Sequence, residues 1–544
     1  MFSPERRSRV ALLAALIATA VVTPRAQPFD FAHPSTSLGV TLSLSKGQGG
    51  QPDRAQVLAA MKRATTFMVE KVAYRGGYVW SYLPDRSRRW GEMEAKPTMI
   101  WIQPPGTPSM GHLFLDAYHA TGDEYYYRAA EQVASALALA QHPSGGWNYI
   151  ADFAGEASLR EWYDTIGKNA WRLEEFQHYY GNATFDDAGT AESAKFFLRL
   201  FVEKKDPTYR APLDKAIKFV LDSQYPIGVW PQRFPKAAAA SLHGLPDYTS
   251  YATFNDDVAA ENIDFLLMCY QAFGDAALLD PIVRGMNAFL VTQMGAPQPG
   301  WGLQHTLDLL PVGARTYEPK ALVTHTSATN LGLLLRFYRL TGETKFLARI
   351  PEALDWLEKL TLPPGVAPPG RTHPTFVEIG TNEPLYVHRE GSNVFNGRYF
   401  VDKSPTGTIV HYSAFRNIDV AGLRKQFESA KNTPPSDVIK TSPLKLGAGK
   451  VPLPKYYTPA TSGDAARVVA DLNAEGYWLA PLGYNSNPYK ADGSKAARAG
   501  DFSQTYVGDE SDTSPFPDPK LMGISIDAYV RNIGVLIRTL DASK

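Results

Sequence analysis

A repeated segment constrains the fold of this 544-residue chain more than any other feature. Residues 184–198 align without a gap with residues 253–267, so the two copies lie 69 residues apart. In each copy a phenylalanine and two or three polar residues precede a helical stripe of apolar residues. Related segments at residues 105–118 and 325–338 continue the series. A period of about 70 residues predicts repeated units in which a polar loop leads into a helix.

Each unit is completed by a second helix and by a Gly-Trp element. In three units a short turn with Asp or Glu opens the second helix. The Gly-Trp element recurs between units, as Gly145-Gly-Trp147, Gly228-Val-Trp230 and Gly300-Trp301. Hairpins of this kind bury their apolar faces against neighbouring hairpins, in an open stack or in a ring. Because no polar capping repeat is visible, we predict a mainly α fold: an α/α toroid, that is, an incomplete α/α barrel of helical hairpins, whose loops line one mouth.

The composition divides the chain into four parts. Three arginines precede an apolar run at residues 10–22 that is too short to span a bilayer, so residues 1–26 are predicted to be a signal peptide. Residues 27–52 are rich in Ser, Gly, Pro and Gln and are predicted to be a linker. The toroid is predicted over residues 53–362. Residues 363–544 are predicted to form an irregular C-terminal region with short strands, whose final apolar helix packs back on the toroid.

The balance of charge argues against one class of partner. Lys and Arg together number 55, as do Asp and Glu, so the formal net charge is zero. This balance argues against a nucleic-acid binder but allows a local basic cleft for an acidic polysaccharide. No segment approaches ~20 uninterrupted apolar residues, so we expect no membrane span, and we expect a monomer that is secreted or periplasmic. The single cysteine, Cys269, excludes disulfides within the chain and is expected in the core.

The acidic cluster of the second copy is the strongest candidate for a chemical site. Asn255, Asp256 and Asp257 stand where the chain enters the helix. Such residues can cap a helix and complement its dipole. Three together offer more oxygens than one helix start can use, and calcium binds oxygens. We therefore predict that Asp256, with Asn255 or Asp257, binds a divalent cation at the toroid mouth. Asp186 and Asp187 of the first copy could pair with Asp256 and Asp257 across that mouth.

Four further motifs follow one another between residues 214 and 390. They are Ser-Gln-Tyr-Pro-Ile-Gly-Val-Trp-Pro-Gln-Arg-Phe-Pro at 223–235, Tyr-Ala-Thr-Phe-Asn-Asp at 251–256, Trp-Gly-Leu-Gln-His at 301–305 with Gly-Ala-Arg-Thr-Tyr-Glu at 313–318, and Glu-Ile-Gly-Thr-Asn at 378–382. In this order they resemble the helical-toroid pectate lyases of polysaccharide lyase family 10. The resemblance covers about a third of the chain.

This resemblance implies β-elimination on α-1,4-linked polygalacturonate. Calcium (Ca2+) would bridge protein carboxylates and the uronate, and an arginine would act as base on the C5 proton. A C5–H bond beside a carboxylate becomes acidic when a cation and arginine donors neutralise that carboxylate. Asp256 matches the family's metal-side aspartate. Arg315 and Glu318 match its Ala-Arg-x-Tyr-Glu element, where a buried ion pair that only holds a loop is an equal alternative. The candidate substrate-binding residues are Trp230, Arg233, Trp301 and His305.

Two departures from the family pattern fall on the chemistry. Thr306 follows Gln-His, where the family usually carries a second aspartate. Thr375 stands where the family pattern places the arginine taken as base. Arg371 and Arg389 lie nearby in the sequence and could take over that role. With Arg315, they are the candidate catalytic residues.

These observations favour an exported polysaccharide lyase and leave two other functions open. A toroid without the base would bind uronate oligomers and not cleave them, as Thr306 and Thr375 permit. Paired aspartates could instead serve a glycoside hydrolase, one as acid and one as base or nucleophile. The histidines show no spacing typical of metal ligands, which argues against a zinc site.

Overall fold

The structure is a computed structural model that describes residues 52–167, 174–237, 246–390, 398–409, 412–458, 463–482 and 522–542. The predicted signal peptide and nearly all of the predicted linker lie outside these residues. The division of the chain into four parts therefore stays a prediction.

Helices make up most of the described chain. The α-helices are α1 (Arg54–Phe67), α2 (Thr107–Thr121), α3 (Glu124–Ala140), α4 (Glu156–Thr165), α5 (Glu174–Gln177), α6 (Gly189–Lys204), α7 (Arg210–Ser223), α8 (Val258–Phe273), α9 (Leu279–Thr292), α10 (Thr324–Thr341), α11 (Ile350–Lys359), α12 (Val420–Lys431), α13 (Pro435–Val438), α14 (Pro443–Leu446), α15 (Ala465–Ala470) and α16 (Ile526–Ala542).

Local sequence explains where several of these helices begin and end. The Asp53 side chain accepts a hydrogen bond from the Gln56 N–H at the start of α1, and the Gln56 side chain accepts one from the Asp53 N–H, which is a capping box. Helices α2, α8 and α10 each end at a glycine in the left-handed conformation, namely Gly122, Gly274 and Gly342. Glycine adopts this conformation without a steric penalty, so it ends these helices cleanly.

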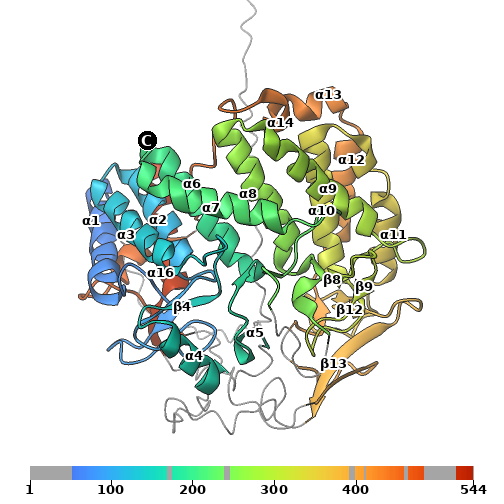
Figure 1. Ribbon diagram of the computed structural model, residues 1–544, viewed down its shortest axis with the longest axis horizontal. Helices are drawn as coiled ribbons and strands as arrows, with labels where there is room; N and C mark the ends of the chain where they lie inside the picture. Colours follow the sequence, from blue (N-terminus) through green and yellow to red (C-terminus); the bar gives the residue numbers. More distant parts are fainter. Residues whose placement is uncertain are drawn as a thin grey trace, which may run out of the picture.

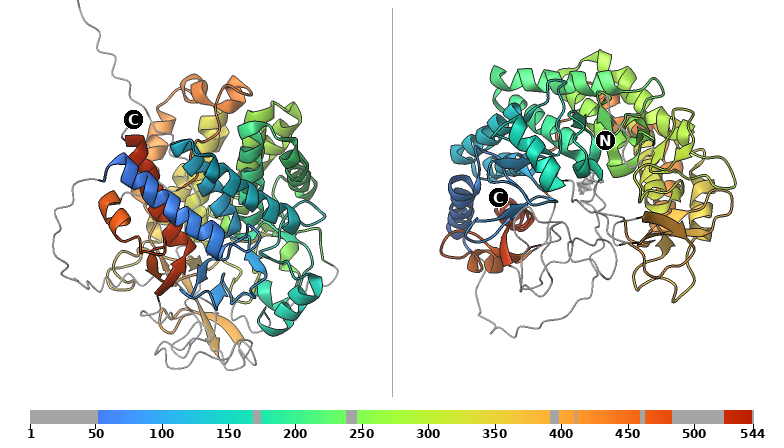
Figure 2. Two further views of the ribbon diagram at one scale, coloured as in Figure 1. Left: turned by 90° about the vertical axis from the view of Figure 1, so that its left-hand side faces the viewer. Right: turned by 60° about the horizontal axis from the view of Figure 1, so that its bottom comes forward.

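The helices form an arc of hairpins (Figures 1 and 2). Helix α2 packs on α3, α6 on α7, α8 on α9 and α10 on α11, while α2, α6 and α8 also pack on one another. At the far end of the arc, α12 lies against α10 and α11. Within the described residues the hairpins do not close into a barrel, so the prediction of a mainly α, incomplete α/α barrel is confirmed.

The last helix lies beside the first. Helix α16 packs against α2, α1 and α15, and Thr65 of α1 shares a 2.7 Å hydrogen bond with the Tyr529 hydroxyl of α16. The 90° view of Figure 2 shows α1 and α16 running side by side. The first hairpin of the arc is therefore assembled from segments 464 residues apart.

Short strands join the helices. They are β1 (Ser81–Tyr82), β2 (Arg89–Trp90), β3 (Met99–Trp101), β4 (Ile150–Asp152), β5 (Ala183–Thr184), β6 (Arg233–Phe234), β7 (Ala252–Thr253), β8 (Gln304–His305), β9 (Pro311–Val312), β10 (Leu322–Val323), β11 (His373–Pro374), β12 (Phe376–Val377), β13 (Pro384–Glu390), β14 (Arg398–Asp402), β15 (Phe415–Arg416), β16 (Leu479–Pro481) and β17 (Met522–Ser525). Their sheets have the orders β16-β17-β1-β2, β10-β12-β13-β14, β7-β8-β9, β3-β4, β5-β6 and β11-β15, and the pairs are antiparallel. Strands β3, β5 and β7 each precede the first helix of a unit.

The tryptophan of the Gly-Trp element fastens each unit to the one before. The indole N–H of Trp147 donates to the Leu137 carbonyl oxygen in α3, and that of Trp230 to the Val220 carbonyl oxygen in α7, both at 2.8 Å. Trp478 makes the same bond to Val468, ten residues earlier in α15. Trp478 is thus a further copy of the element, which the sequence pattern had not revealed.

The glycine of the element permits a close approach of two backbones. Gly145 and Gly228 have φ of 108° and 101°. A Cβ atom at either position would lie 2.2 Å from a carbonyl oxygen, of Lys215 in α7 or of Arg284 in α9. Any other residue would therefore be strained by its own φ and would push a helix of the next unit away.

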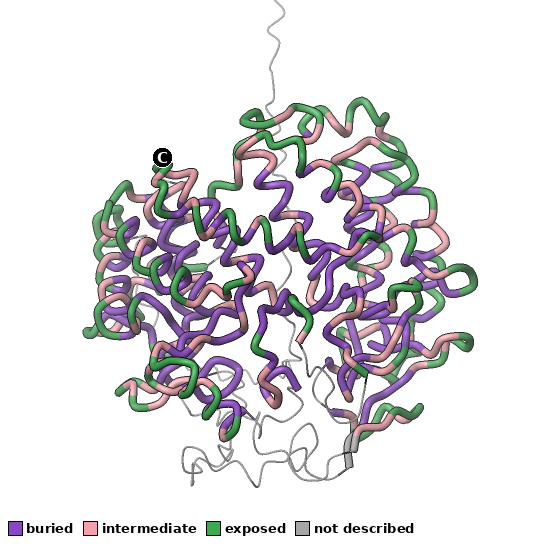
Figure 3. Tube along the Cα trace, viewed as in Figure 1, coloured by how far each residue is buried: buried purple, intermediate pink, exposed green. Residues whose placement is uncertain are grey.

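Buried residues lie mostly in the interior of the arc (Figure 3). One continuous apolar core extends from Val57 in α1 to Leu540 in α16, and it includes Cys269, as predicted. In the described residues no helix is both long enough and apolar enough to cross a membrane.

Candidate active site

Two acidic turns of identical backbone conformation form the centre of the site. Strand β5 leads through Asp186 and Asp187 into α6, and β7 leads through Asn255 and Asp256 into α8. Asp187 (φ 53°, ψ 29°) and Asp256 (φ 52°, ψ 30°) are both left-handed, and so is the residue after each. This conformation is rare outside glycine and costs free energy, so its repetition indicates that the turns hold their side chains for a purpose.

The two turns bring three carboxyl groups together. One oxygen each from Asp186, Asp187 and Asp256 lies within 4.8 Å of the others. Asp186 is wholly buried, whereas the other two are partly accessible. Among the described residues Oδ1 of Asp186 and Oδ1 of Asp256 accept no hydrogen bond of good geometry. Clustered carboxylate oxygens without donors are suited to a hard divalent cation, so these residues fit such an ion.

Neighbouring side chains fix the three carboxylates. The Tyr149 hydroxyl donates to Asp186 Oδ2 at 2.5 Å. The Gln103 amide donates to Asp187 Oδ2 at 2.6 Å, and the Asn255 amide donates to Asp256 Oδ2 at 2.7 Å. One oxygen of each aspartate is thus held by a hydrogen bond from a defined neighbour.

The electrostatics of this triad are those of a site that needs a cation. Burial alone raises the pKa of Asp186, but the Arg315 guanidinium and hydrogen bonds from Asp256 and Tyr149 outweigh it, so this pKa lies below its ordinary value. Burial and the charge on Asp186 hold the pKa values of Asp187 and Asp256 well above theirs. Without a cation the triad therefore retains protons, because three charges cannot be accommodated together.

The partners of Asp256 differ from those predicted. Asp257 is not part of the cluster, and burial followed by the charges of Glu261 and Asp264 raises its pKa to about 7. The Asn255 amide donates to Asp256, and its oxygen lies 3.3 Å from the Tyr412 hydroxyl. The predicted role of Asp257 as a co-ligand therefore gains no support from the structure. Asp186 and Asp187 of the other copy take that place.

Arg315 cannot act as the base. Its guanidinium donates to both carboxylate oxygens of Glu318, at 3.0 and 2.8 Å, and to the Tyr412 hydroxyl at 3.1 Å. Its Nη1 lies 3.3 Å from Asp186 and from Glu175. Burial would lower the pKa of Arg315, but Glu318 and the other anionic neighbours raise it. These contacts favour the alternative of a buried ion pair that holds a loop, and Arg315 also lowers the pKa of Asp186.

Arg233, unlike Arg315, has guanidinium nitrogens without a hydrogen-bond partner among the described residues. It is 2% exposed, and its Nη1 donates to Asn182 at 3.1 Å and to Asn148 at 3.3 Å. The guanidinium lies against the rings of Tyr149 and Tyr180, 5.1 and 4.5 Å from their centroids. In the described chain its Nε and Nη2 have no hydrogen-bond partner. These two nitrogens form the fork that binds a carboxylate.

The other predicted substrate-binding residues are buried in the protein. Trp230 and Trp301 are 0% exposed and pack inside the arc as parts of the Gly-Trp element, so neither can stack on a sugar. His305 is also 0% exposed and packs edge-on against Phe254. These three predictions were wrong, because the sequence does not separate an aromatic side chain that packs from one that binds.

The remaining candidates lie in the β8–β9 hairpin and in the segment that forms β11 to β13. Arg371 precedes β11 and is partly exposed, and Arg389 lies in β13 with its side chain outside the described residues, so both stay predictions. Thr375, at the position of the family's arginine, is buried and donates to the Ser413 carbonyl. Thr306 lies at the turn of the β8–β9 hairpin, where its N–H donates to the Leu310 carbonyl.

Sequence reasoning missed Gln103, Tyr149 and Tyr412. Gln103 could have been found, since the offset of 83 residues between the first two copies places it opposite Asp186. Tyr149 and Tyr412 carry no such signal, because they reach the triad from other parts of the chain.

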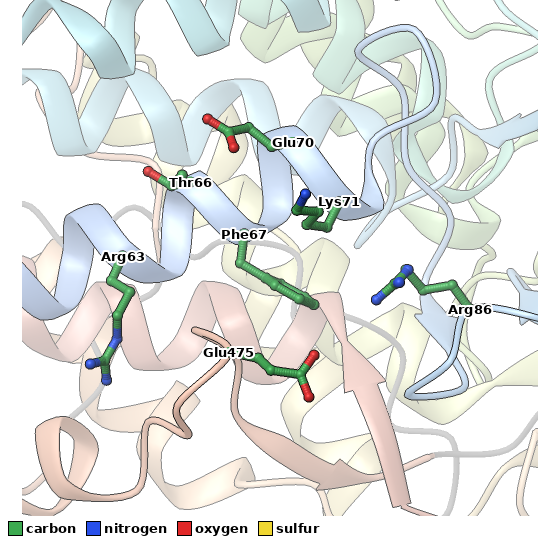
Figure 4. A pocket seen from close by; sticks show the side chains of 7 residues that line it. All are labelled: Arg63, Thr66, Phe67, Glu70, Lys71, Arg86 and Glu475. Carbon is green, nitrogen blue, oxygen red and sulfur yellow. The ribbon is translucent and has the colours of Figure 1, made fainter.

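A hollow lies beside the end of α1 (Figure 4). It has a volume of about 450 Å³ and is lined by Arg63, Thr66, Phe67, Glu70, Lys71, Arg86 and Glu475. None of the triad or its neighbours lines it.

Comparison with known proteins supports the family resemblance. Residues 157–362 match the family model for pectic acid lyase, which confirms the resemblance inferred from the motifs and supports a lyase enzyme. No curated protein matches the chain.

Several solved structures are similar to the chain. A variant of a family 10 polysaccharide lyase from Cellvibrio cellulosa, in complex with trigalacturonic acid, is 17% identical, covers 60% of this chain and 98% of its own, and has a TM-score of 0.38. A GH76A α-1,6-mannanase from Salegentibacter sp. is 10% identical, covers 90% and 98%, and has a TM-score of 0.36. Since both scores are below 0.5, these likenesses carry no conclusion on activity.

Proposed function

We propose that the protein is an exported polysaccharide lyase that cleaves a uronate-containing polysaccharide, polygalacturonate first of all, by calcium-assisted β-elimination. The triad of Asp186, Asp187 and Asp256 carries this proposal, because buried oxygens that lack donors among the described residues need a cation. Arg233 supports it, since two nitrogens of its buried guanidinium have no partner in the described part of the chain and can bind an anion. Tyr149 connects the two, with its ring against Arg233 and its hydroxyl on Asp186.

The charges of the site match an acidic polymer only in this combination. Bare carboxylates would repel a polyuronate, so the triad must be neutralised before the substrate approaches. Bound calcium supplies positive charge that withdraws electron density from the uronate carboxylate and acidifies the neighbouring C5–H. Arg233 binds and orients the same carboxylate class with its Nε and Nη2. Arg315 keeps Asp186 ionised and therefore ready to hold the ion.

The reaction balances without any further reagent. A base takes the C5 proton, the electron pair of that bond forms the C4–C5 double bond, and the C4–O bond breaks. The departing oxygen takes a proton and becomes the new chain end. The three guanidinium nitrogens of Arg315 are engaged by Glu318, Asp186 and Tyr412. Arg371 and Arg389 are therefore the remaining candidates for the base.

Product analysis tests this proposal. Purified protein is incubated with polygalacturonate, alginate and glycosaminoglycans, with calcium or with a chelator, and the ultraviolet absorbance of the 4,5-unsaturated product is followed. We expect calcium-dependent absorbance with polygalacturonate, and its loss in Asp256→Asn and Arg233→Met. Asp257→Asn is the matched control, since Asp257 shares the backbone turn but lies outside the triad. Calcium-independent cleavage, or equal losses in the Asp256 and Asp257 variants, would contradict the proposal.

A hydrolase is the second candidate, and one observation favours it. The pKa of Asp186 is lowered while those of Asp187 and Asp256 are raised, which is how a carboxylate and a carboxylic acid are separated in glycosidases. One oxygen of each aspartate lies within 4.8 Å of the others, so these groups are close enough to act as a pair. New reducing ends without the unsaturated chromophore would establish this alternative.

A binding protein without turnover is the third outcome of the same assays. The buried Thr375 at the position of the family's arginine favours it. Calcium-dependent binding of uronate oligomers in calorimetry, without any product after prolonged incubation, would identify it.

A further inference from the structure

We infer that Gln232 is a fourth protein ligand of the divalent cation held by Asp186, Asp187 and Asp256, through the oxygen of its side-chain amide. This inference rests on the cation site of the proposed function and extends it by a neutral ligand.

The backbone places Gln232 between the two acidic turns. On one side its carbonyl oxygen accepts hydrogen bonds from the Phe185 N–H at 2.8 Å and from the Thr184 hydroxyl at 3.1 Å, directly before Asp186. On the other side the carbonyl oxygen of Trp230 accepts from the Thr253 N–H at 3.0 Å, in the strand that leads to Asp256. Residues 230–232 therefore bridge the two turns that supply the triad.

The side chain of Gln232 has a buried amide oxygen without a donor at this place. It is 0% exposed, and its amide N–H faces Asp186, whose charged form it favours. Within the described residues its amide oxygen has no hydrogen-bond partner. A buried oxygen of this kind is costly, and native proteins rarely retain one without a reason.

A cation at the triad removes this cost. The amide oxygen of glutamine is an ordinary ligand for calcium, which takes six to eight oxygens, so three aspartates leave room for it. A neutral oxygen also adds no charge to a site where carboxylates already repel one another. The same ion would then satisfy Gln232 and the donor-free Oδ1 atoms of Asp186 and Asp256.

Gln304 provides a matched control in the chain itself. It lies in β8, it is also 0% exposed, and in the described structure its amide oxygen also lacks a partner. It pairs with Thr253 in β7, whereas the backbone of Gln232 contacts Thr184 in β5. A general effect of removing a buried glutamine should therefore appear equally at Gln232 and Gln304.

Metal binding without substrate tests the inference. The full chain is titrated with calcium in calorimetry, and with terbium, whose luminescence the nearby Tyr149 ring can sensitise. We expect Gln232→Leu to weaken calcium binding at least about tenfold, because one of the ion's few protein oxygens is lost. Gln232→Glu should retain binding, since it keeps an oxygen in place, and Gln304→Leu should bind within about twofold of the wild type.

The outcomes separate this inference from the proposed function. Wild-type binding that survives Gln232→Leu, or that falls equally in Gln304→Leu, overturns the ligand role of Gln232 and leaves the triad intact. Failure of Gln232→Glu to bind, in a protein whose circular dichroism matches the wild type, also overturns it. Absence of binding by the wild type, with no further change in Asp256→Asn, overturns the cation site and both proposals with it.

Discussion

His305→Phe should make the stability of the protein less sensitive to acid. His305 is wholly buried, and in the described residues neither ring nitrogen has a hydrogen-bond partner. Burial therefore lowers its pKa from the ordinary 6.5 to about 3. Phenylalanine is suited to this place, because Phe234 occupies the equivalent register in the preceding unit: Phe234 pairs with Ala183 as His305 pairs with Ala252.

The sign and size of the effect follow from proton linkage. Between pH 6.5 and pH 3 the unfolded chain protonates His305 while the folded protein does not, so stability is lost as the pH falls through this range. Each pH unit below 6.5 costs about 1.4 kcal/mol of unfolding free energy. At pH 5 the cost is therefore about 2 kcal/mol, and at pH 8 it is negligible.

Urea unfolding followed by tryptophan fluorescence, with calcium chelated, measures this effect. The loss of unfolding free energy between pH 8 and pH 5 should be about 2 kcal/mol smaller in His305→Phe than in the wild type. The buried His325, whose pKa is also lowered, contributes equally to both proteins. Phe254→Leu is the control: it removes the ring that packs on His305 and should lower stability alike at both pH values. If His305→Phe loses as much unfolding free energy between pH 8 and pH 5 as the wild type does, His305 is not buried as a neutral side chain.

Three further changes test other parts of the structure. Calcium should raise the melting temperature of the wild type but not of Asp256→Ala, and equal shifts in both would make Asp256 only a helix cap. Arg315→Met should lower the unfolding free energy in urea by about 3–5 kcal/mol, because it leaves buried carboxylates unpaired, and a loss below about 1 kcal/mol would contradict that role. Gly228→Ala should lower the unfolding free energy in urea by more than about 1 kcal/mol, because the new Cβ atom clashes with the Arg284 carbonyl. Gly365→Ala should lower it by less, because Gly365 has a similarly positive φ but open space around it.

The repeat pattern predicted the helical part of the fold because apolar spacing reports directly on which face is buried. The segments at residues 184–198 and 253–267 both proved to be an acidic turn followed by a helix, α6 and α8. Two-residue strands such as β6 and β8 have no periodicity, so their pairing, and with it the place of Gln232, was not predictable.

The chemistry was predictable only in part. Asp256 was found because an acidic residue at a helix start has a recognisable context, and its pairing with Asp186 and Asp187 followed from the repeat. The sequence could not separate Arg315 from Arg233. Both are buried arginines in family motifs. In the described residues carboxylates pair with Arg315 and none pairs with Arg233, and this difference separates a structural role from a binding role.

The pairing of α1 with α16 sets the order in which the protein can fold during synthesis. Helix α1 leaves the ribosome long before its partner exists, and the Thr65–Tyr529 contact closes a loop of 464 residues. The hairpins α2–α3 to α10–α11 join neighbours in sequence and can assemble from the N-terminal side onward. The apolar face of α1 stays uncovered by α16 until the last helix has been synthesised, so the nascent chain exposes part of this face in the meantime.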